Sequence, residues 1–392
     1  MNSIQRRRSL LAGLVLCSSV LCSQDTIKIG FVGTLSGPNA AWGSSNVRSM
    51  ETSAEIYNEK GGVKIGDKKY KIEVVPFDDA YDPKLAVAGM EKMAQKKISY
   101  VVGPNDDAQA IAVRPLAEKN KIVYFPYAFD KSLYQKPANY AVFGMIASYQ
   151  WEPSVYKWLK ENKGVKTIAF IAANAADPLN QRDNGIQIAK DLGLKVVEAK
   201  ATYQADTRDF YSVITPIIKK KPDLLVLSGV SPSTAPLIIK TARELGFKGH
   251  MAAGTALDAG ILKEGAGDAA NGFICQGGAG PEIQSDRMKE WVKHYTKKYG
   301  EYNDESNTKV FALEFILAVM MANPKAINDA DEFLKTVDSG WSTFNPFLKD
   351  TATQLSFVGK SSFGQNRQLG VPLTPKIYEN GTFKTLFVGA AD

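Results

Sequence analysis

The chain has 392 residues, 44% of them hydrophobic and 23% charged, an ordinary composition for a folded protein long enough for two domains. Its formal net charge of +7 is spread over many lysines instead of one basic stripe, which argues against a nucleic-acid partner. The two histidines, His250 and His294, lie in unremarkable settings. We therefore expect no His-based catalytic triad, no metal site and no cofactor.

The first predicted element is an export signal in residues 1–24. Arginines at positions 6–8 precede an apolar run at 10–21, which is too short to cross a bilayer as a helix. This order is typical of a secretory signal peptide, and the paired arginines leave both Sec and Tat export open. Cys22 leaves a lipid anchor open, although a bulky leucine precedes it. Removal of the signal would leave Cys275 as the single cysteine, so no intramolecular disulfide is expected.

Strand-like and helix-like segments alternate along the rest of the chain. Short apolar runs, typical of buried parallel strands, lie at Ile27–Val32, Ile72–Phe77, Tyr100–Val102, Ile122–Phe125, Thr167–Ala172, Lys195–Ala199, Leu224–Leu227 and His250–Ala253. Segments of helical period separate them, which predicts parallel sheets with right-handed crossovers. The pattern restarts near Lys166, so we expect two doubly wound units.

After Phe273–Gln276 the chain is predicted to be mainly helical. The ten residues Ala312–Met321 are nearly all apolar, and a segment of that length indicates a buried helix instead of a membrane span. Asn380-Gly381 within Pro375–Val388 predicts a hairpin. Pro216, inside an earlier helical segment, is expected to kink that helix or to mark its start.

The segment Ile27–Asp82 carries the most specific motifs of the chain. They are Leu35-Ser36-Gly37-Pro38, Trp42-Gly43, Asn58-Glu59-Lys60-Gly61-Gly62, Asp78-Asp79 and Asp82-Pro83. In this order they closely resemble the opening of the periplasmic Leu/Ile/Val-binding-protein family, the type I solute-binding proteins of ABC importers. The resemblance extends over nearly all of the chain that follows the predicted signal.

The resemblance implies an α/β fold with two Rossmann-like lobes, a three-segment hinge and a ligand cleft between the lobes. It places lobe 1 at 25–142 plus 277–356 and lobe 2 at 143–276 plus 357–392. The three crossings are expected near Tyr140–Met145, Phe273–Gly278 and Leu355–Phe363. It further implies a monomer in the periplasm, which closes on a small-molecule ligand by a hinge motion and delivers it to an ABC transporter permease in the membrane.

Loops that follow parallel strands meet at one edge of a sheet, where open α/β folds bind ligands. The expected ligand-binding residues are Trp42, Asn105, Asp106, Asp107, Tyr127, Ala128, Phe129, Tyr149, Trp151, Ser231 and Asp258. Two alternatives stay open. Asp106 and Asp107 equally suit the start of the helix that follows them, and Tyr149 and Trp151 equally suit packing at the hinge.

The chain departs from the amino-acid receptors at several positions that grip the ligand in that family. Phe129 replaces the usual threonine, Val230-Ser231 replace a tyrosine, and Thr255-Ala256 stand where leucine-type receptors carry a glutamate. Pro178-Leu179-Asn180 replace an aromatic-glycine pair. The changed pocket is more aromatic and acidic, which favours an aromatic, cationic or hydroxylated ligand, although a branched-chain amino acid stays open.

Three classes of function are compatible with the sequence. A receptor for an ABC importer agrees with the export signal and the two lobes, whereas a sensor that presents the same cleft to a histidine kinase would have the same sequence features. An enzyme would need an acid, base or nucleophile in the cleft. Asp106 and Asp107 are the only candidates, and neighbours on one loop rarely point at the same reacting atom. We therefore expect a binding protein without enzymatic activity.

Overall fold

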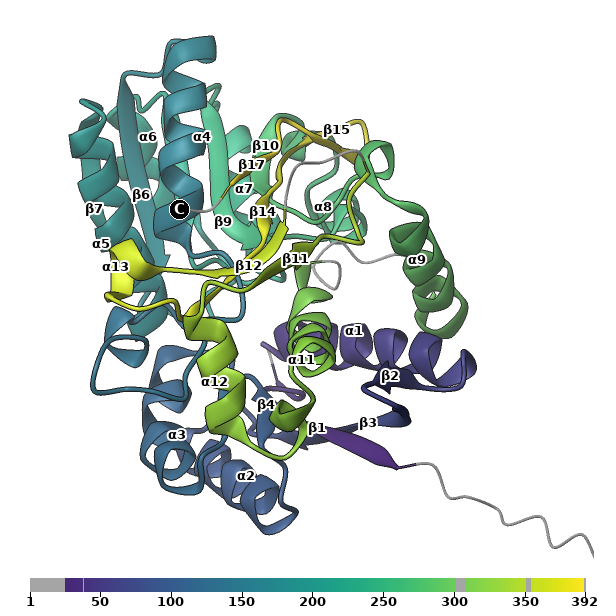
Figure 1. Ribbon diagram of the computed structural model, residues 1–392. Helices are drawn as coiled ribbons and strands as arrows, with labels where there is room; N and C mark the ends of the chain where they lie inside the picture. The colour runs from purple at the N-terminus through teal and green to yellow at the C-terminus, as the bar shows by residue number, and fades with distance from the viewer. Residues whose placement is uncertain (1–24, 38, 301–307, 350–353, 391–392) are drawn as a thin grey trace, which may run out of the picture.

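The computed structural model describes residues 25–37, 39–300, 308–349 and 354–390. The predicted export signal, with its arginines and Cys22, lies outside the described residues. Within them, strands form one five-stranded sheet, one seven-stranded sheet and two small sheets, and helices cover both large sheets (Figure 1).

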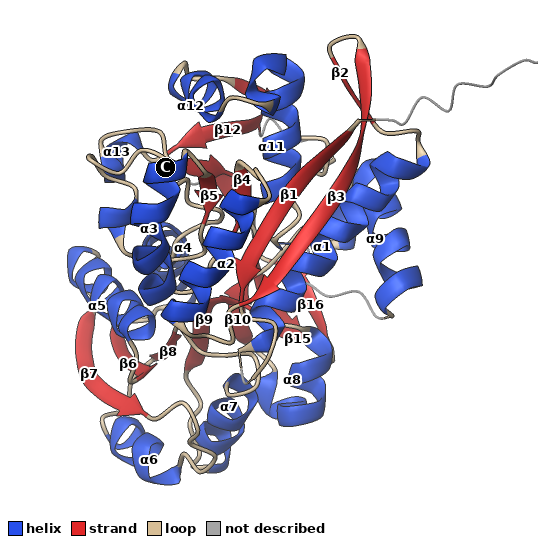
Figure 2. Ribbon diagram, turned by 90° about the horizontal axis from the view of Figure 1, so that it is seen from below, coloured by secondary structure: helices blue, strands red, loops and turns tan. Residues whose placement is uncertain are grey.

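The five-stranded sheet has the order β2-β3-β1-β4-β5. Its strands are β1 (Thr26–Gly33), β2 (Val63–Ile65), β3 (Lys68–Asp78), β4 (Tyr100–Val102) and β5 (Val123–Phe125), all parallel except β2. Helix α1 (Ala40–Glu59) lies on one side of β1 and β3, and α2 (Pro83–Gln95) lies on the other (Figure 2). The next helix along the chain, after β4, is α3 (Asp107–Asn120). Side chains alternate accordingly along β4: Val102 joins one core and Val101 the other.

The seven-stranded sheet has the order β16-β15-β10-β9-β8-β6-β7. Its strands are β6 (Thr167–Ala173), β7 (Lys195–Tyr203), β8 (Leu224–Ser228), β9 (His250–Ala256), β10 (Phe273–Gln276), β15 (Pro375–Glu379) and β16 (Thr382–Thr385). The helices are α4 (Ser148–Lys163), α5 (Ala176–Asp191), α6 (Tyr211–Lys219), α7 (Ala235–Glu244) and α8 (Ala259–Ala266). Ile168 and Phe170 pack in one core with α4 and α5, whereas Ala169 and Ile171 pack in the other with α6, α7 and α8.

The chain passes three times between the two large sheets: after β5, after β10 and before β15. After β10 it contributes α9 (Asp286–Tyr299), α11 (Phe311–Ala322) and α12 (Ala330–Asp338), which lie beside the first sheet, before returning to the second (Figure 1). The smaller elements are β11 (Ser342–Phe344), β12 (Gln354–Val358), α13 (Lys360–Phe363), β13 (Gln368–Gly370), β14 (Pro372–Leu373), β17 (Gly389–Ala390) and the short helices Lys131–Leu133, Gly267–Ala270, Pro281–Ile283 and Pro324–Ile327. The residue boundaries given above for the two lobes stay a prediction.

All eight predicted strands are present, although β3 begins four residues earlier and β7 ends four residues later than expected. The hairpin at Asn380-Gly381 joins β15 to β16, and both turn residues have the positive φ that such a turn requires. Pro216 does not mark a helix start, because α6 begins at Tyr211. Helix α11 is a buried core helix, and among the described residues no helix is both long and apolar enough to cross a membrane.

Candidate functional site

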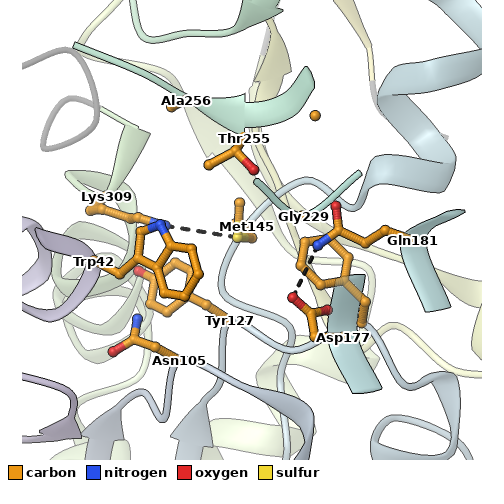
Figure 3. A pocket seen from close by; sticks show the side chains of 12 residues that line it. Trp42, Asn105, Tyr127, Met145, Asp177, Gln181, Gly229, Thr255, Ala256 and Lys309 are labelled. Carbon is orange, nitrogen blue, oxygen red and sulfur yellow. Dashed lines mark hydrogen bonds between the residues drawn. The ribbon is translucent and has the colours of Figure 1, made fainter. Parts of the chain in front are cut away.

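A pocket lies where the carboxyl ends of both large sheets meet, and together with the solvent-open space at its mouth it has about 510 Å³ free of protein atoms. Chain segments that follow β1, β4 and β5 line it from the first sheet, and β9 and segments that follow β6 and β8 line it from the second (Figure 3). The lining residues are Trp42, Asn105, Tyr127, Phe129, Met145, Asp177, Gln181, Gly229, Gly254, Thr255, Ala256 and Lys309. Ligand sites of open α/β sheets occupy this position.

The first sheet contributes an aromatic wall and one amide. Trp42 lies in the first turn of α1, while Tyr127 and Phe129 follow β5. Asn105 follows β4, and its Oδ1 atom lies where it would clash with a Cβ atom at Gly33. Because glycine at the end of β1 has no side chain, there is room for the Asn105 side chain at the pocket wall.

The second sheet contributes polar side chains from the start of α5. Asp177 and Gln181 lie one helical turn apart, and Gln181 Nε2 donates a hydrogen bond of 3.0 Å to Asp177 Oδ2. Gly229 follows β8 with a φ of 56°, and a Cβ atom there would lie 2.7 Å from Pro178 Cα. Glycine at this position therefore lets the start of α5 approach the sheet, which brings Asp177 to the pocket.

Lys309 reaches the pocket from the segment just before α11. Its side chain is buried, with 6% of the residue exposed, and its Nζ atom lies 4.1 Å from the centre of the Tyr127 ring. The same Nζ atom is 3.8 Å from Met145 Sδ. A cation over an aromatic face is attracted by the ring, so Tyr127 holds the ammonium group at the pocket wall.

Several buried polar atoms at the pocket wall lack a hydrogen-bond partner among the described residues. They include both amide atoms of Asn105, the hydroxyl group of Tyr127 and Oδ1 of Asp177. Asn105 and Asp177 are each 7% exposed. Buried polar groups in folded proteins are nearly always hydrogen-bonded, so these atoms are suited to hold a polar solute or ordered water.

Three carboxyl groups from the two sides of the molecule approach one another beside the pocket. Burial raises the pKa of Asp177 well above its ordinary value, and the nearby charges of Asp107 and Asp106 raise it further. Burial also raises the pKa of Asp106 and of Asp107. Asn180 Nδ2 on α5 lies 3.5 Å from Asp107 Oδ2, which links α5 to the start of α3. The arrangement therefore favours protonated carboxyl groups when the two sides are this close.

Four of the predicted ligand-binding residues line the pocket, namely Trp42, Asn105, Tyr127 and Phe129. Asp106 does not line it: as the N-cap of α3 it accepts a hydrogen bond from Ala108 N at 2.9 Å. Asp107 lies behind the wall and accepts hydrogen bonds from the backbone of Phe129 and Asp130, at 2.6 and 2.9 Å. The helix-start alternative therefore describes Asp106, and Asp107 supports the loop that carries Phe129.

The other five predicted residues lie outside the pocket lining. Ala128 is buried and its carbonyl accepts a hydrogen bond from the hydroxyl group of Tyr134. Tyr149 packs beneath Lys131, while Trp151 is 1% exposed and belongs to the hydrophobic core.

Ser231 and Asp258 lie at the starts of helices. Ser231 Oγ donates to Thr234 Oγ1 at 2.8 Å just before α7, and Asp258 caps α8 by accepting from Gly260 N at 2.7 Å. Ligand contact by any of the eleven predicted residues stays a prediction.

Asp177, Gln181, Met145, Gly229, Gly254 and Lys309 were not predicted as site residues. Asp177 follows a strand, β6, in the way that Asn105 follows β4, so the same rule of strand ends would have found it. Lys309 carries a weaker signal, a lysine directly before an apolar helix. Among the described residues, no group of three or more histidine, cysteine, aspartate or glutamate side chains could hold a metal ion.

Comparison with known proteins identifies the family. The model of the periplasmic binding protein family matches residues 26–354. The leucine-specific-binding protein of Salmonella typhimurium is 28% identical over 276 residues, which cover 69% of this chain and 72% of that protein.

Two solved structures share the fold. One is a branched-chain amino acid transporter substrate binding protein of Streptococcus pneumoniae in complex with isoleucine, with a TM-score of 0.75, 20% identity and coverage of 93% of this chain and 99% of that one. The other is an ABC transporter solute binding protein of R. palustris in complex with 4-hydroxybenzoate, with a TM-score of 0.75, 18% identity and coverage of 94% and 98%.

These similarities confirm the predicted fold, two α/β units of the type I periplasmic binding protein kind. The matched family consists of binding proteins, which agrees with the expectation of no enzymatic activity. Because the family match extends over most of the chain, with a pocket between the two sheets where such a fold binds its ligand, this protein belongs to the periplasmic binding protein family.

Proposed function

We propose that this protein is the solute-binding protein of an ABC importer and that it captures an amino-acid-like or aromatic small molecule between its two sheets. The observation that carries the proposal is the pocket itself. Buried polar atoms of Asn105, Tyr127 and Asp177 lack partners there among the described residues. A polar solute would supply the missing hydrogen bonds.

The aromatic lining of the pocket favours an aromatic solute within this class. Trp42, Tyr127 and Phe129 supply aromatic surface on the side of the first sheet. A ring between such side chains gains roughly 0.5–1.5 kcal/mol beyond the burial of its area. The relative solved with 4-hydroxybenzoate supports this choice, whereas the relative solved with isoleucine supports an amino acid.

The mechanism is closure of the pocket and involves no chemical reaction. The lining residues come from both sheets, so a solute touches all of them only when the two sides are close together. Its greater affinity for that state shifts the equilibrium toward it. After export by the Sec or Tat route, the closed form would present surfaces of both units to a membrane permease in the periplasm.

A thermal-shift screen of residues 25–392 tests the proposal, with aliphatic amino acids, aromatic acids and amines as candidates. A solute that binds only the native protein adds about 2.7 kcal/mol of stability at a hundredfold excess over its Kd, which raises Tm. The control is Thr255→Trp, which fills the pocket and should abolish the shift. No shift with any compound, or an equal shift in the control, would contradict the proposal.

A further inference from the structure

We propose that Lys309 selects for a carboxylate in this pocket, so that the bound solute is an organic acid whose opposite end carries a hydroxyl group for Asp177. The inference rests on the proposed function, because it names the substrate class of the same pocket. Figure 3 shows Lys309, Trp42 and Asn105 on one side of the pocket and Asp177 and Gln181 on the other. Lys309 and Asp177 thus give the pocket two different ends.

At one end, the position of Lys309 suits recognition of an anion. Its Nζ atom lies 4.1 Å from the centre of the Tyr127 ring, so the amine is held over an aromatic face and aimed at the pocket. Lys309 is buried, with only 6% of its surface exposed. A hydrogen bond from an ammonium group to a carboxylate is stronger than one between neutral groups, especially where water is scarce.

Asn105 lies at the same end and provides a second donor. Its Nδ2 atom has no hydrogen-bond partner among the described residues, and neither has its Oδ1 atom. A carboxylate has two oxygen atoms and accepts several hydrogen bonds. Lys309 and Asn105 together therefore match a carboxylate better than they match a single neutral acceptor.

At the opposite end, Asp177 faces the pocket with one unsatisfied oxygen. Gln181 occupies Oδ2, whereas Oδ1 has no partner in the described part of the chain. Asp106, Asp107 and the hydroxyl group of Tyr81 lie on the side of the first sheet nearest to Asp177. Burial and the neighbouring carboxyl groups raise the pKa of Asp177. This direction favours the protonated form, and the unpartnered Oδ1 atom then suits a neutral hydroxyl group.

The test compares an acid with its amide by isothermal titration calorimetry. The probes are 4-hydroxybenzoate and 4-hydroxybenzamide, and the proteins are the wild type, Lys309→Gln and the control Lys325→Gln, which changes an exposed lysine in the short helix after α11. We expect the wild type to bind the acid at least about tenfold more tightly than the amide. K309Q should weaken binding of the acid by about 10- to 100-fold and leave the amide unchanged, and K325Q should change neither.

Equal weakening of acid and amide by K309Q would overturn the inference, since Lys309 would then only support the shape of the pocket. A wild-type preference for the amide would overturn it as well. If neither probe binds while the wider screen yields an amine or a neutral solute, the inference fails and the proposed function stands. If no compound in either experiment binds, both fail.

The far end is tested with Asp177→Asn and Asp177→Ala. An asparagine resembles a protonated aspartate, so D177N should keep the affinity for 4-hydroxybenzoate within about threefold, whereas D177A should lower it by about tenfold. Benzoate, which lacks the hydroxyl group, should bind D177A and the wild type equally. A loss of 100-fold or more in D177N would show an ionised carboxylate that faces a cation, and would overturn the assignment of this end.

Discussion

The pocket joins three kinds of side chain, each with a separate role. Trp42, Tyr127 and Phe129 form an apolar aromatic wall, Lys309 carries a buried amine over the Tyr127 ring, and Asp177 presents a carboxyl oxygen from the other side. Such a mixture of apolar walls with a few polar groups is typical of small-ligand sites. In the proposed complex, the aromatic wall would supply affinity and the two polar ends would orient the solute.

The role of Trp42 is tested by removing its ring. Trp42→Ala should raise the Kd of the solute found in the screen by about tenfold, because the solute loses one aromatic contact and part of its buried surface. The matched control is Trp158→Ala, a half-buried tryptophan on α4 that packs under Lys163 and does not line the pocket. Calorimetry on both variants checks the prediction, and equal Kd values for W42A and the wild type would contradict it.

At this scale the sequence predicted the residues that follow strands of the first sheet. Asn105, Tyr127 and Phe129 are at the wall because the ends of parallel strands meet at one edge. Asp106 also follows β4 but caps α3 instead of lining the pocket, because neighbouring residues on a loop point in different directions. Trp151, on α4, belongs to the hydrophobic core. Lys309 lies more than 180 residues after Tyr127 in the chain. No local pattern shows that its amine packs over the Tyr127 ring, because that contact depends on the path of the whole chain.

Among the elements, α5 decides the shape of the pocket, because its first turns carry Asp177 and Gln181. Its start packs on Gly229, where a Cβ atom would lie 2.7 Å from Pro178 Cα. Residue 229 also has a φ of 56°, a conformation that glycine adopts most readily. The end of β8 and the start of α5 therefore set each other's position.

Gly229→Ala tests this contact against Gly246→Ala, where φ is also positive at 84° but no atom lies within 4 Å of the added Cβ. The control should lose about 1 kcal/mol of unfolding free energy through backbone strain alone. G229A should lose about 1–3 kcal/mol more, because Pro178 must shift, and its solute affinity should fall as well. Urea denaturation and calorimetry measure both effects, and equal losses in the two variants would contradict the account.

Helices α3 and α5 meet through acidic side chains, which predicts that solute affinity depends on pH. In the closed arrangement burial and the charges of Asp107 and Asp106 raise the pKa of Asp177. If the open form leaves this carboxyl group in water with its ordinary pKa, closure takes up a proton. A state that binds more protons is favoured at low pH, so affinity is highest at low pH and falls as pH rises from the ordinary carboxyl range through the raised pKa of Asp177.

Calorimetry from about pH 5 to about pH 8, with a solute that does not titrate in this range, checks the sign. Kd should rise with pH, by at most about tenfold per pH unit for one coupled proton. Asp177→Asn removes the titrating group and should flatten the dependence, although Asp106 and Asp107 still titrate nearby. A Kd that is constant, or that falls with rising pH, would contradict the account.

Secondary structure was more predictable than the site. Helices pack on both sides of the buried strands, so these strands are short runs of apolar residues. Their positions can therefore be read from the pattern of apolar residues in the sequence. The ends of β3 and β7 were missed because their extra residues are mostly polar or half-exposed. Pro216 lies inside α6, so of its two predicted positions only the helix start is wrong; packing of Ile214 and Ile217 into the core holds the helix around it.

For the whole molecule, the path of the chain explains how two units can share one pocket. Three passages between the large sheets connect them, and Met145 on the first passage lines the pocket. Two units linked in this way can rotate about the connecting segments while each core stays intact. A solute that contacts both sides then acts as the bridge that favours the closed arrangement.

The central claim, that this protein closes around a small solute, is tested most directly by small-angle X-ray scattering of residues 25–392 with and without the solute at saturation. The account predicts a smaller radius of gyration with the solute, because solute contacts from both sheets draw the two units together. The variant with Trp at position 255, in which the pocket is filled, should not respond to the solute. Identical scattering curves of the wild type with and without saturating solute would contradict the account.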